Sequence, residues 1–248
     1  MTSTVPKVNR QAMIERMKQM LSIDPTQTAV LTIDMQRGAL DSELATLPVP
    51  PEECKRVLEG TGQLLAMARG AKMRVIHVLT SWHPCEIAAH PFERAIVEAK
   101  QSLTPHAQSD YAHHKLEGSR AAEMMPELGP EPSDLLITSK RRFDMFYGTN
   151  LEILLRVLKI DTVILAGANT NTCVQCSAFG AYNRDLKVIV AADCVASAYG
   201  PDLHEFALDN VRRRLGWVLT NSEIAEKLRG GIASASDSNV ARLAGKAP

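Results

Sequence analysis

Short apolar runs alternate with amphipathic stretches along most of the chain. The runs are rich in β-branched residues and too short for helices, which predicts strands at 28–36, 74–80, 134–139, 162–165, 187–192 and 217–220. The stretch 50–71 has apolar residues at helical spacing and begins with two prolines. Strands that alternate with helices are typical of a parallel sheet with helices on both faces. The pattern therefore predicts an α/β fold, with three layers (α/β/α) around a mostly parallel, doubly wound sheet.

Further helices are predicted around these strands. Three of them lie at 11–23, 151–160 and 203–215. A fourth has Cys173 in its first turn, and a last one follows a cap at Ser222. Thr149 and Glu152 have the T-x-x-E spacing of a capping box in front of the second of these helices. The first helix carries methionines on one face, which we expect to cover the protein's own core. Contact with a neighbouring subunit is the alternative for that face.

The chain divides into three parts. Residues 1–27 form an N-terminal extension that contains the amphipathic helix, residues 28–229 form one domain, and residues 230–248 form a polar tail that we expect to be mobile. Within the domain, residues 81–132 show no sustained helix or strand pattern. Loops of this length are usually lids or binding loops. We therefore expect ligand specificity to reside in this stretch.

Charge and cysteine content exclude several classes of protein. Lysine and arginine (28) balance aspartate and glutamate (28), so no net field favours nucleic acid or an anionic membrane. No apolar run approaches the roughly 18 residues of a membrane helix. The five cysteines are an odd number, and no apolar signal segment opens the chain. We therefore expect a soluble protein of the reducing cytoplasm, without nucleic-acid or membrane partners.

Three polar residues stand at the ends of predicted strands. Asp34 lies at the end of the first strand, Lys140 follows the third and Cys173 follows the fourth. The carboxyl ends of parallel strands share one edge of the sheet, where open α/β folds bind ligands. There the carboxylate can take the thiol proton, the ammonium can hold both groups ionised, and the thiolate can attack a carbonyl. The pattern predicts a Cys-Asp-Lys nucleophile set.

Cys173 also stands in the first turn of a predicted helix. Unpaired N–H groups and the positive end of the helix dipole lower the pKa of a thiol, so we expect a thiolate-prone cysteine. Cys173 and Cys176 form a C-x-x-C pair, which suggests a thiol redox protein as an alternative. That alternative leaves Asp34 and Lys140 without a role, and Cys176 is expected to pack inside the helix.

Four fragments follow one another in a specific order and spacing. They are V-L-T-I-D-M-Q around Asp34, K-R-R-F-D-M-F-Y-G-T-N-L from Lys140, G-A-N-T-N-T-C-V around Cys173 and D-C-V-A-S from Asp193. Together they resemble the isochorismatase-like cysteine hydrolases, which include nicotinamidases, N-carbamoylsarcosine amidases, ureidoacrylate amidases and biuret hydrolases. The likeness runs from about residue 28 to about residue 219. It implies that family's α/β/α fold, with Asp34 as general base and acid, Lys140 as its electrostatic partner and Cys173 as nucleophile.

The same resemblance implies a cis peptide between Ala168 and Asn169, which aims the backbone N–H groups of Asn169 and Cys173 at an oxyanion. We expect cleavage of a C–N bond in a small amide, carbamoyl or ureido compound through a thioester. Relatives that cleave the vinyl ether of isochorismate need only the aspartate, and they are the alternative from the same fold. The retained Cys173 favours C–N cleavage. Family members are commonly homo-oligomers, so we expect a dimer or tetramer.

No metal or other cofactor is expected. Nicotinamidases bind a divalent ion through a D-x-H motif and a later histidine. In this chain Ser81 takes the place of that aspartate before His83, and His90 follows. A hydroxyl is a poor replacement for a carboxylate, so a metal site is the less favoured alternative.

Substrate contacts are expected from side chains near the proposed mouth of the site. A guanidinium fork can hold a carboxylate, and aromatic rings can form a pocket wall. The candidates are Arg142, Trp82, Phe146 and Tyr147. Histidines of the long irregular stretch are instead expected as solvated lid residues, with a place in the pocket lining as the alternative for one of them: His106, His113 and His114.

Overall fold

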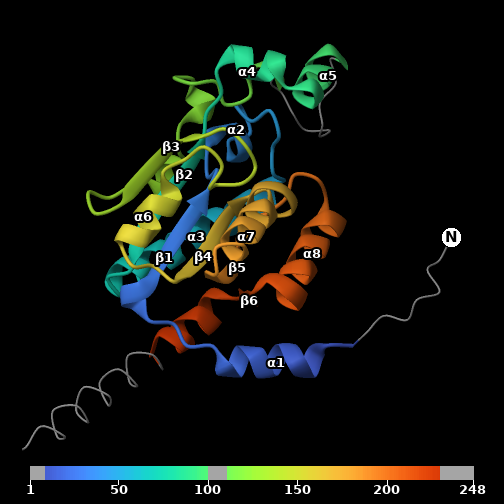
Figure 1. Ribbon diagram of the computed structural model, residues 1–248. Helices are drawn as coiled ribbons and strands as arrows, with labels where there is room; N and C mark the ends of the chain where they lie inside the picture. The colour runs from blue at the N-terminus through green and yellow to red at the C-terminus, as the bar shows by residue number, and fades with distance from the viewer. Residues whose placement is uncertain (1–8, 100–110, 230–248) are drawn as a thin grey trace, which may run out of the picture.

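The central sheet has six strands, and all neighbouring strands pair in parallel (Figure 1). The computed structural model describes residues 9–99 and 111–229, and within them the strand order is β3-β2-β1-β4-β5-β6. The strands are β1 (Thr28–Ile33), β2 (Arg74–Thr80), β3 (Leu135–Lys140), β4 (Thr162–Ala168), β5 (Lys187–Ala196) and β6 (Trp217–Leu219). Every predicted strand is present, and the predicted α/β/α class with a doubly wound sheet is confirmed.

Helices cover both faces of the sheet. One face carries α2 (Arg37–Leu40), α3 (Pro51–Gly70) and a last helix (221–229), and the other carries α6 (Leu151–Val157), α7 (Gln175–Tyr182) and α8 (Pro201–Asn210) (Figure 1). Successive residues of a strand point to opposite faces, so Val30 of β1 joins the first core cluster while Ala29 and Leu31 join the second. Burial on both faces explains why β1 and β4 are continuous apolar runs.

The sheet has its switch point between β1 and β4. β1 pairs with β2 on one side and with β4 on the other, and later strands add toward the opposite edges. Gly167 near the end of β4 has φ 141° and lies so close to Ile33 that an added Cβ would be 2.0 Å from the Ile33 carbonyl oxygen. Only glycine fits such an approach. The crevice beyond these two strand ends is where open α/β sheets bind ligands.

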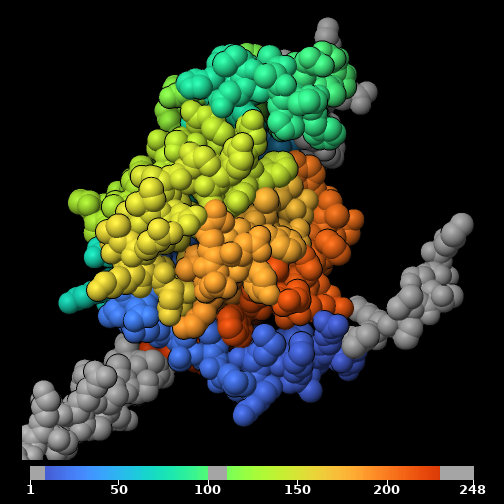
Figure 2. Space-filling view, in the orientation of Figure 1, coloured from blue at the N-terminus to red at the C-terminus, as the bar shows by residue number. Residues whose placement is uncertain are grey.

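Two short helices, α4 (Pro84–Ala89) and α5 (Pro91–Ala99), stand over the carboxyl end of the sheet, whereas α1 (Gln11–Met20) lies at the opposite end (Figures 1 and 2). Helices α4 and α5 fall within residues 81–132, so the prediction of an irregular stretch is wrong there. Each of these two helices begins with proline, and a capping box between His83 and Glu86 caps the N-terminus of α4. Helices of 6 and 9 residues are too short for periodicity to identify them.

The predicted capping box in front of α6 does not form. The helix starts one residue later than the box requires, with Asn150 at the cap position. The hydroxyl of Thr149 accepts a hydrogen bond from Leu151 N (3.3 Å), while Glu152 instead pairs with Arg184 at 2.7 Å. A tertiary ion pair therefore replaces the local bond that the sequence spacing suggests.

The last helix starts earlier than predicted, because Thr220 rather than Ser222 caps it. Glu223 N donates to Thr220 Oγ1 at 3.2 Å, and Thr220 N donates to Glu223 Oε2 at 2.8 Å. These reciprocal bonds are those of a capping box, displaced by two residues from the predicted cap.

The N-terminal helix α1 ends at Met20 and contributes no buried side chain. Met13 is 44% exposed and Met20 is 72% exposed, so the prediction that the methionine face covers the core is wrong. Leu21 and Ile23, which follow the helix in extended chain, enter the core instead. Trp217 Nε1 donates to a backbone carbonyl of α1 at 3.0 Å and ties the helix to β6.

No helix within residues 9–99 and 111–229 is long and apolar enough to cross a membrane. The first eight residues of the predicted extension, the tail at 230–248 and His106 lie outside the described residues.

Candidate active site

Asp34 is the first residue beyond β1. Its backbone has a positive φ of 56°, and its N–H donates to the carbonyl oxygen of Val78 at 2.9 Å. Such a conformation is uncommon for residues with a Cβ and clusters at functional sites. The residue is only 1% exposed, at the switch point of the sheet. The turn thus holds a carboxylate in the interior, where it needs partners.

Lys140 reaches Asp34 from the far side of β2. Its Nζ donates to Asp34 Oδ2 at 2.7 Å and to Thr80 Oγ1 at 2.8 Å, and the Thr80 hydroxyl donates to Asp34 Oδ1 at 2.8 Å. Each of the three side chains comes from the end of a different strand, β3, β2 or β1. The hydroxyl from the middle strand therefore bridges a buried ammonium and a buried carboxylate.

Gln36 fixes the position of Thr80. Its side-chain amide accepts a hydrogen bond from Thr80 N at 3.0 Å and donates to Thr80 O at 2.7 Å. Neither residue is among the site residues predicted from the sequence. Thr80 nevertheless ends a predicted strand, so the strand-end argument that identifies Asp34 could also have identified Thr80.

Cys173 faces the same pair from β4. It lies in a π-helical turn (Thr170–Val174) between β4 and α7 and is 9% exposed. Its Sγ is 3.4 Å from Lys140 Nζ, and the thiol is hydrogen-bonded to the Asp34 carboxylate. The structure thus brings together the three residues that the strand ends predict.

The surrounding charges decide where the proton resides. Burial by itself raises the pKa of Asp34, but the charges of Lys140 and Lys115 and hydrogen bonds from Cys173 and Lys140 hold it at about 2. Burial and the Asp34 carboxylate raise the pKa of Cys173 to about 11, although both lysines act to lower it. The prediction of a lowered thiol pKa is therefore wrong, because desolvation and a negative neighbour outweigh the helix terminus. At rest Asp34 is ionised and Cys173 is protonated.

The turn before Cys173 carries the groups predicted to bind an oxyanion. The peptide bond between Ala168 and Asn169 is cis. The Asn169 side chain accepts a hydrogen bond from Ala198 N at 2.8 Å, which anchors the turn to the segment after β5. Asn169 and Cys173 both line the cavity described next, and the role of their N–H groups stays a prediction.

A cavity of about 70 Å³ opens beside these groups. Phe92, Glu93 and Ile96 of α5 line it, as do Tyr111 and Tyr199 from segments that follow α5 and β5. Of the two helices that stand over the carboxyl end of the sheet (Figure 1), α5 therefore forms part of the cavity wall. So small a cavity suits a small substrate.

A second buried lysine, Lys115, also lines the cavity and is 4% exposed. Its positive charge lowers the pKa of both Asp34 and Cys173. Burial lowers the pKa of Lys115 itself, and the negative charges of Asp34 and Cys173 oppose that effect. Lys115 lies in the long stretch without a sequence pattern, so no signal in the sequence marks it.

His114 is buried beside Lys115 and lines the cavity, so for this histidine the alternative of a place in the pocket lining holds rather than the expectation of a solvated side chain. Its Nδ1 is hydrogen-bonded to the Thr46 hydroxyl, and its ring stacks on Tyr111 with centroids 5.0 Å apart. Burial holds the pKa of His114 well below its ordinary value. His113, in contrast, is exposed as predicted.

Two of the four predicted substrate-contacting residues line the cavity. These are Trp82 and Arg142, whose guanidinium carbon lies 5.3 Å from the centroid of the indole ring. Phe146 is buried against α7, with Arg184 at 4.2 Å over its ring, and Tyr147 is 62% exposed. Their predicted place in the pocket wall is therefore wrong, because the turn after β3 directs one ring into the core and the other to solvent.

The side chains around Ser81 serve local contacts. The Ser81 hydroxyl accepts a hydrogen bond from Arg141 at 2.6 Å, His83 lies 2.9 Å from Glu117, and His90 Nδ1 accepts one from the backbone of α5 at 3.3 Å. Among the described residues, no three side chains of histidine, cysteine, aspartate or glutamate converge to hold an ion. The residues present therefore do not fit the metal site that the less favoured alternative requires.

Cys176 lies in the first turn of α7 and is half-buried. Burial raises its pKa, as it does for Cys173, and both thiols are free. A C-x-x-C redox pair at a helix terminus works through a thiol of lowered pKa. The surroundings of these two cysteines thus disfavour the redox alternative.

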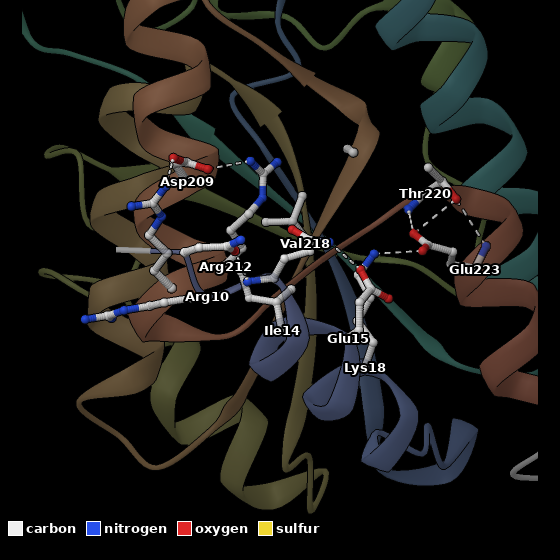
Figure 3. A pocket seen from close by; sticks show the side chains of 13 residues that line it. Arg10, Ile14, Glu15, Lys18, Asp209, Arg212, Val218, Thr220 and Glu223 are labelled. Carbon is white, nitrogen blue, oxygen red and sulfur yellow. Dashed lines mark hydrogen bonds and ion pairs between the residues drawn. The ribbon is translucent and has the colours of Figure 1, made fainter. Parts of the chain in front are cut away.

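A larger cavity, of about 750 Å³, lies at the other end of the sheet beside α1 (Figure 3). Five of the charged side chains that line it form ion pairs: Lys18 lies 2.8 Å from Glu223, and Asp209 lies 2.7 Å from both Arg212 and Arg213. No cysteine or histidine is among the described residues that line it. The candidate chemistry belongs to the smaller cavity.

Comparison with known proteins agrees with this geometry. The family model for the isochorismatase domain matches residues 28–223. The chain belongs to the isochorismatase family. A curated relative, the ureidoacrylate amidohydrolase RutB of Methylorubrum extorquens, is 30% identical over 206 residues, which cover 80% of this chain and 81% of that protein. A maleamate amidohydrolase of Pseudomonas putida is 27% identical over 204 residues, which cover 81% of this chain and 86% of that protein.

A solved cysteine hydrolase from Pseudomonas syringae pv. phaseolicola shares the isochorismatase fold. It superimposes with a TM-score of 0.72 over 85% of this chain and 96% of its own, at 21% identity. At that identity the likeness establishes the fold alone. The family membership therefore rests on the match over residues 28–223 and on the curated relatives.

Proposed function

We propose that this protein is a cysteine-dependent amidohydrolase that cleaves a C–N bond of a small amide, carbamoyl or ureido compound through a thioester. One observation carries the proposal: the buried ammonium of Lys140 contacts both the Asp34 carboxylate and the Cys173 thiol. Lys140 Nζ lies 2.7 Å from Asp34 Oδ2 and 3.4 Å from Cys173 Sγ, at the edge of a small cavity. A nucleophile, a proton acceptor and a fixed cation are thereby in place for acyl transfer.

The first half of the reaction forms the thioester. As Sγ of Cys173 bonds to the substrate carbonyl carbon, its proton passes to the Asp34 carboxylate. The carbonyl oxygen takes the negative charge and is held by the N–H groups of Asn169 and Cys173. The tetrahedral species then collapses, the C–N bond breaks, and Asp34 returns the proton to the nitrogen, which leaves as ammonia or a small amine.

The second half releases the acid. Water attacks the thioester carbonyl while Asp34 takes one of its protons, and the C–S bond then breaks. The departing sulfur recovers that proton, which restores the resting site. Lys140 stays charged throughout, because its pKa is raised above the ordinary value: burial lowers the pKa, but the charges and hydrogen bonds of Asp34 and Cys173 outweigh that effect.

The difference in acidity between the two groups shapes this mechanism. With Asp34 at a pKa of about 2 and Cys173 at about 11, free thiolate is scarce at neutral pH. Proton transfer is therefore concerted with attack on the carbonyl rather than preceding it. The positive charges of Lys140 and Lys115 lower the pKa of Cys173 and so favour that step.

Hydrolysis of a C–N bond is the activity for which the curated relatives are named, ureidoacrylate amidohydrolase and maleamate amidohydrolase. We extend it to this chain, which is a hydrolase of the same family. Cleavage of a vinyl ether is the other family chemistry. Product analysis separates the two, because only C–N cleavage releases ammonia or an amine.

The test is an assay of ammonia release from ureido acids, biuret-like compounds, maleamate and nicotinamide. We expect wild-type protein to cleave at least one of them, Cys173→Ala to show no turnover, and mass spectrometry of quenched wild-type reactions to find an acyl group on Cys173. Full turnover by Cys173→Ala would falsify the thioester route.

Two further expectations remain proposals. We expect a homo-oligomer, a dimer or tetramer, which light scattering of the purified chain would measure. We also expect the protein in the reducing cytoplasm, where its free cysteines stay reduced.

A further inference from the structure

The two helical faces of the sheet differ in what they expose to solvent. The face formed by α6, α7 and α8 exposes six large apolar or aromatic side chains, each 38% to 72% accessible: Ile153, Val157, Phe179, Tyr182, Leu203 and Phe206. The opposite face, formed by α2, α3 and the last helix, leaves no large apolar side chain exposed among the described residues, although α3 alone is 20 residues long. Contiguous apolar patches on a protein surface usually mark a contact with another molecule. The asymmetry indicates that the α6–α8 face has a partner.

Helix α7 lies at the centre of this face, between α6 and α8, and Figure 2 shows no described segment lying over it (Figures 1 and 2). None of its eight residues, Gln175–Tyr182, is charged. It buries Ala178 and Ala181 in the core and exposes Phe179 and Tyr182 three positions apart, so it is apolar on its inner and its outer side. Interface centres are depleted in charged residues and enriched in aromatic ones. The composition of α7 is that of an interface centre.

Helix α8 carries opposite charges at its two ends. It begins with Asp202 and Glu205, both exposed, and neither forms an ion pair with another described residue. Just beyond its end stands Arg214, whose guanidinium carbon lies 5.3 Å from the ring centroid of Tyr182 on α7. Arg214 is likewise without an ion pair within the described part of the chain. The basic end therefore borders the aromatic centre of the face, and both ends lack a partner of opposite charge.

Helix α6 repeats this order of charges with fewer of them left unpaired. Glu152 lies in its first turn and Arg156 in its last, 3.0 Å apart within the helix. Both α6 and α8 follow strands of a parallel sheet and return toward its amino end, so the two helices run in the same direction. The acidic ends therefore lie together, as do the basic ends. A surface of this kind is complementary to a copy of itself turned end to end.

We propose that the α6–α8 face is the contact between two copies of this chain, related by a two-fold axis that crosses α7 at right angles. In such an isologous contact each surface meets the same surface of the other copy. Phe179 and Tyr182 pack against their own counterparts, and Asp202 and Glu205 lie against Arg214 of the partner subunit, once on each side of the axis. The proposal assigns a surface to the homo-oligomer expected above, and it does not depend on the proposed C–N hydrolysis.

A second copy fits this face better than an unrelated protein does. An acidic partner would satisfy only the Arg214 end, and a basic partner would satisfy only the start of α8, whereas a second copy satisfies both ends at once. The methionine face of α1 is a weaker candidate for the same contact. It exposes Met13 and Met20 but no aromatic ring, and Lys18 on that helix already pairs with Glu223 of its own chain at 2.8 Å.

Matched substitutions on the two candidate surfaces decide between them. Phe179→Lys places a charge at the centre of the α6–α8 face, and Met20→Lys places the same charge on α1, where Met20 is 72% exposed. Light scattering after size-exclusion chromatography at micromolar concentration should show wild type as a dimer or tetramer, Phe179→Lys at half that mass and Met20→Lys unchanged. A monomeric wild type, or a folded Phe179→Lys variant that keeps the wild-type mass, would overturn the inference.

Charge reversal tests the two-fold arrangement without relying on the apolar centre. In Asp202→Lys/Glu205→Lys both ends of the contact become basic, and in Arg214→Glu both become acidic, so each variant alone should dissociate about tenfold or more readily than wild type. An equimolar mixture of the two variants again places opposite charges at both ends. It should associate within about threefold of wild type. A mixture that associates no more tightly than either variant alone would overturn the inference.

The readout keeps this inference separate from the proposed reaction, because it is a molecular mass and not a rate. Circular dichroism of each variant confirms that it is folded before its mass is compared. If Phe179→Lys does not fold, the charge-reversed mixture decides the outcome by itself. Loss of the thioester proposal through an active Cys173→Ala variant would leave the masses unchanged, and a monomeric wild type would leave the test of Cys173 unchanged.

Discussion

The two ends of the sheet carry charge in opposite ways. At the carboxyl end the Lys140 and Asp34 side chains are 1% and 2% exposed and stand beside a cavity of about 70 Å³. At the amino end Lys18 and Glu223 are 24% and 35% exposed and border a cavity of about 750 Å³. The ion pair beside the larger cavity is therefore partly solvated by water, whereas the ion pair beside the smaller cavity has only protein groups as partners.

The difference shows that burial and partner count, rather than cavity size, identify the chemistry. An exposed ion pair contributes little because water competes with it, whereas a buried pair must replace all of its lost hydration. Around Asp34, the charges of Lys140 and Lys115 and the hydrogen bonds lower the pKa of the carboxyl against the effect of burial, whereas burial and the Asp34 carboxylate raise the pKa of Cys173. Perturbed groups of this kind mark functional sites.

The largest effect is expected for Lys140→Met. The change leaves the Asp34 carboxylate buried without its main partner, which should lower the free energy of unfolding by about 3–5 kcal/mol and abolish turnover. Urea unfolding measures the first and ammonia release the second. The double variant Lys140→Met/Asp34→Asn should regain part of the stability, since it no longer buries a lone charge. An unchanged urea midpoint for the single variant would contradict the comparison.

Thr80→Val should have the next largest effect. It removes the hydroxyl that accepts from Lys140 and donates to Asp34, at a cost of about 1–3 kcal/mol in unfolding free energy and about tenfold to hundredfold in kcat/KM. Thr32→Val is the matched control, because that buried hydroxyl on β1 bonds His77 instead, at 2.7 Å. The control should lose stability and keep its activity. Equal losses of activity in both would mean that Thr80 acts only through stability.

Lys115→Met tests whether the second lysine tunes the nucleophile. Lys115 lowers the pKa of Cys173, so its removal should raise that pKa further above about 11 and slow alkylation of Cys173 at every pH below it. Peptide mass spectrometry after iodoacetamide treatment at several pH values gives the rate for this cysteine separately from the others. A profile that coincides with wild type would show that the Lys115 charge does not reach the thiol.

The smallest effect is expected at the amino end. Lys18→Met breaks the exposed pair with Glu223 and should change the free energy of unfolding by no more than about 1 kcal/mol, with kcat/KM unaffected. The same urea and ammonia-release assays apply. A loss as large as that of Lys140→Met would remove the distinction between the two ends.

The sequence by itself determines the sheet and the strand-end residues. Runs buried on both faces must be apolar, and a parallel strand ends where polarity returns, so Asp34, Lys140 and Cys173 are readable as a set. These features depend on local pattern and on the single rule that parallel strands end at one edge.

The tertiary structure alone decides the rest of the site. Lys115 and Glu93 come from segments whose residues show no period that marks them, and only the fold shows that both are buried in the wall of the cavity. The direction of the Cys173 pKa shift is also a tertiary result, because the helix terminus acts locally while desolvation and the Asp34 charge come from the fold. Pattern specifies which residues stand at the edge of the sheet, but only packing specifies which of them water cannot reach.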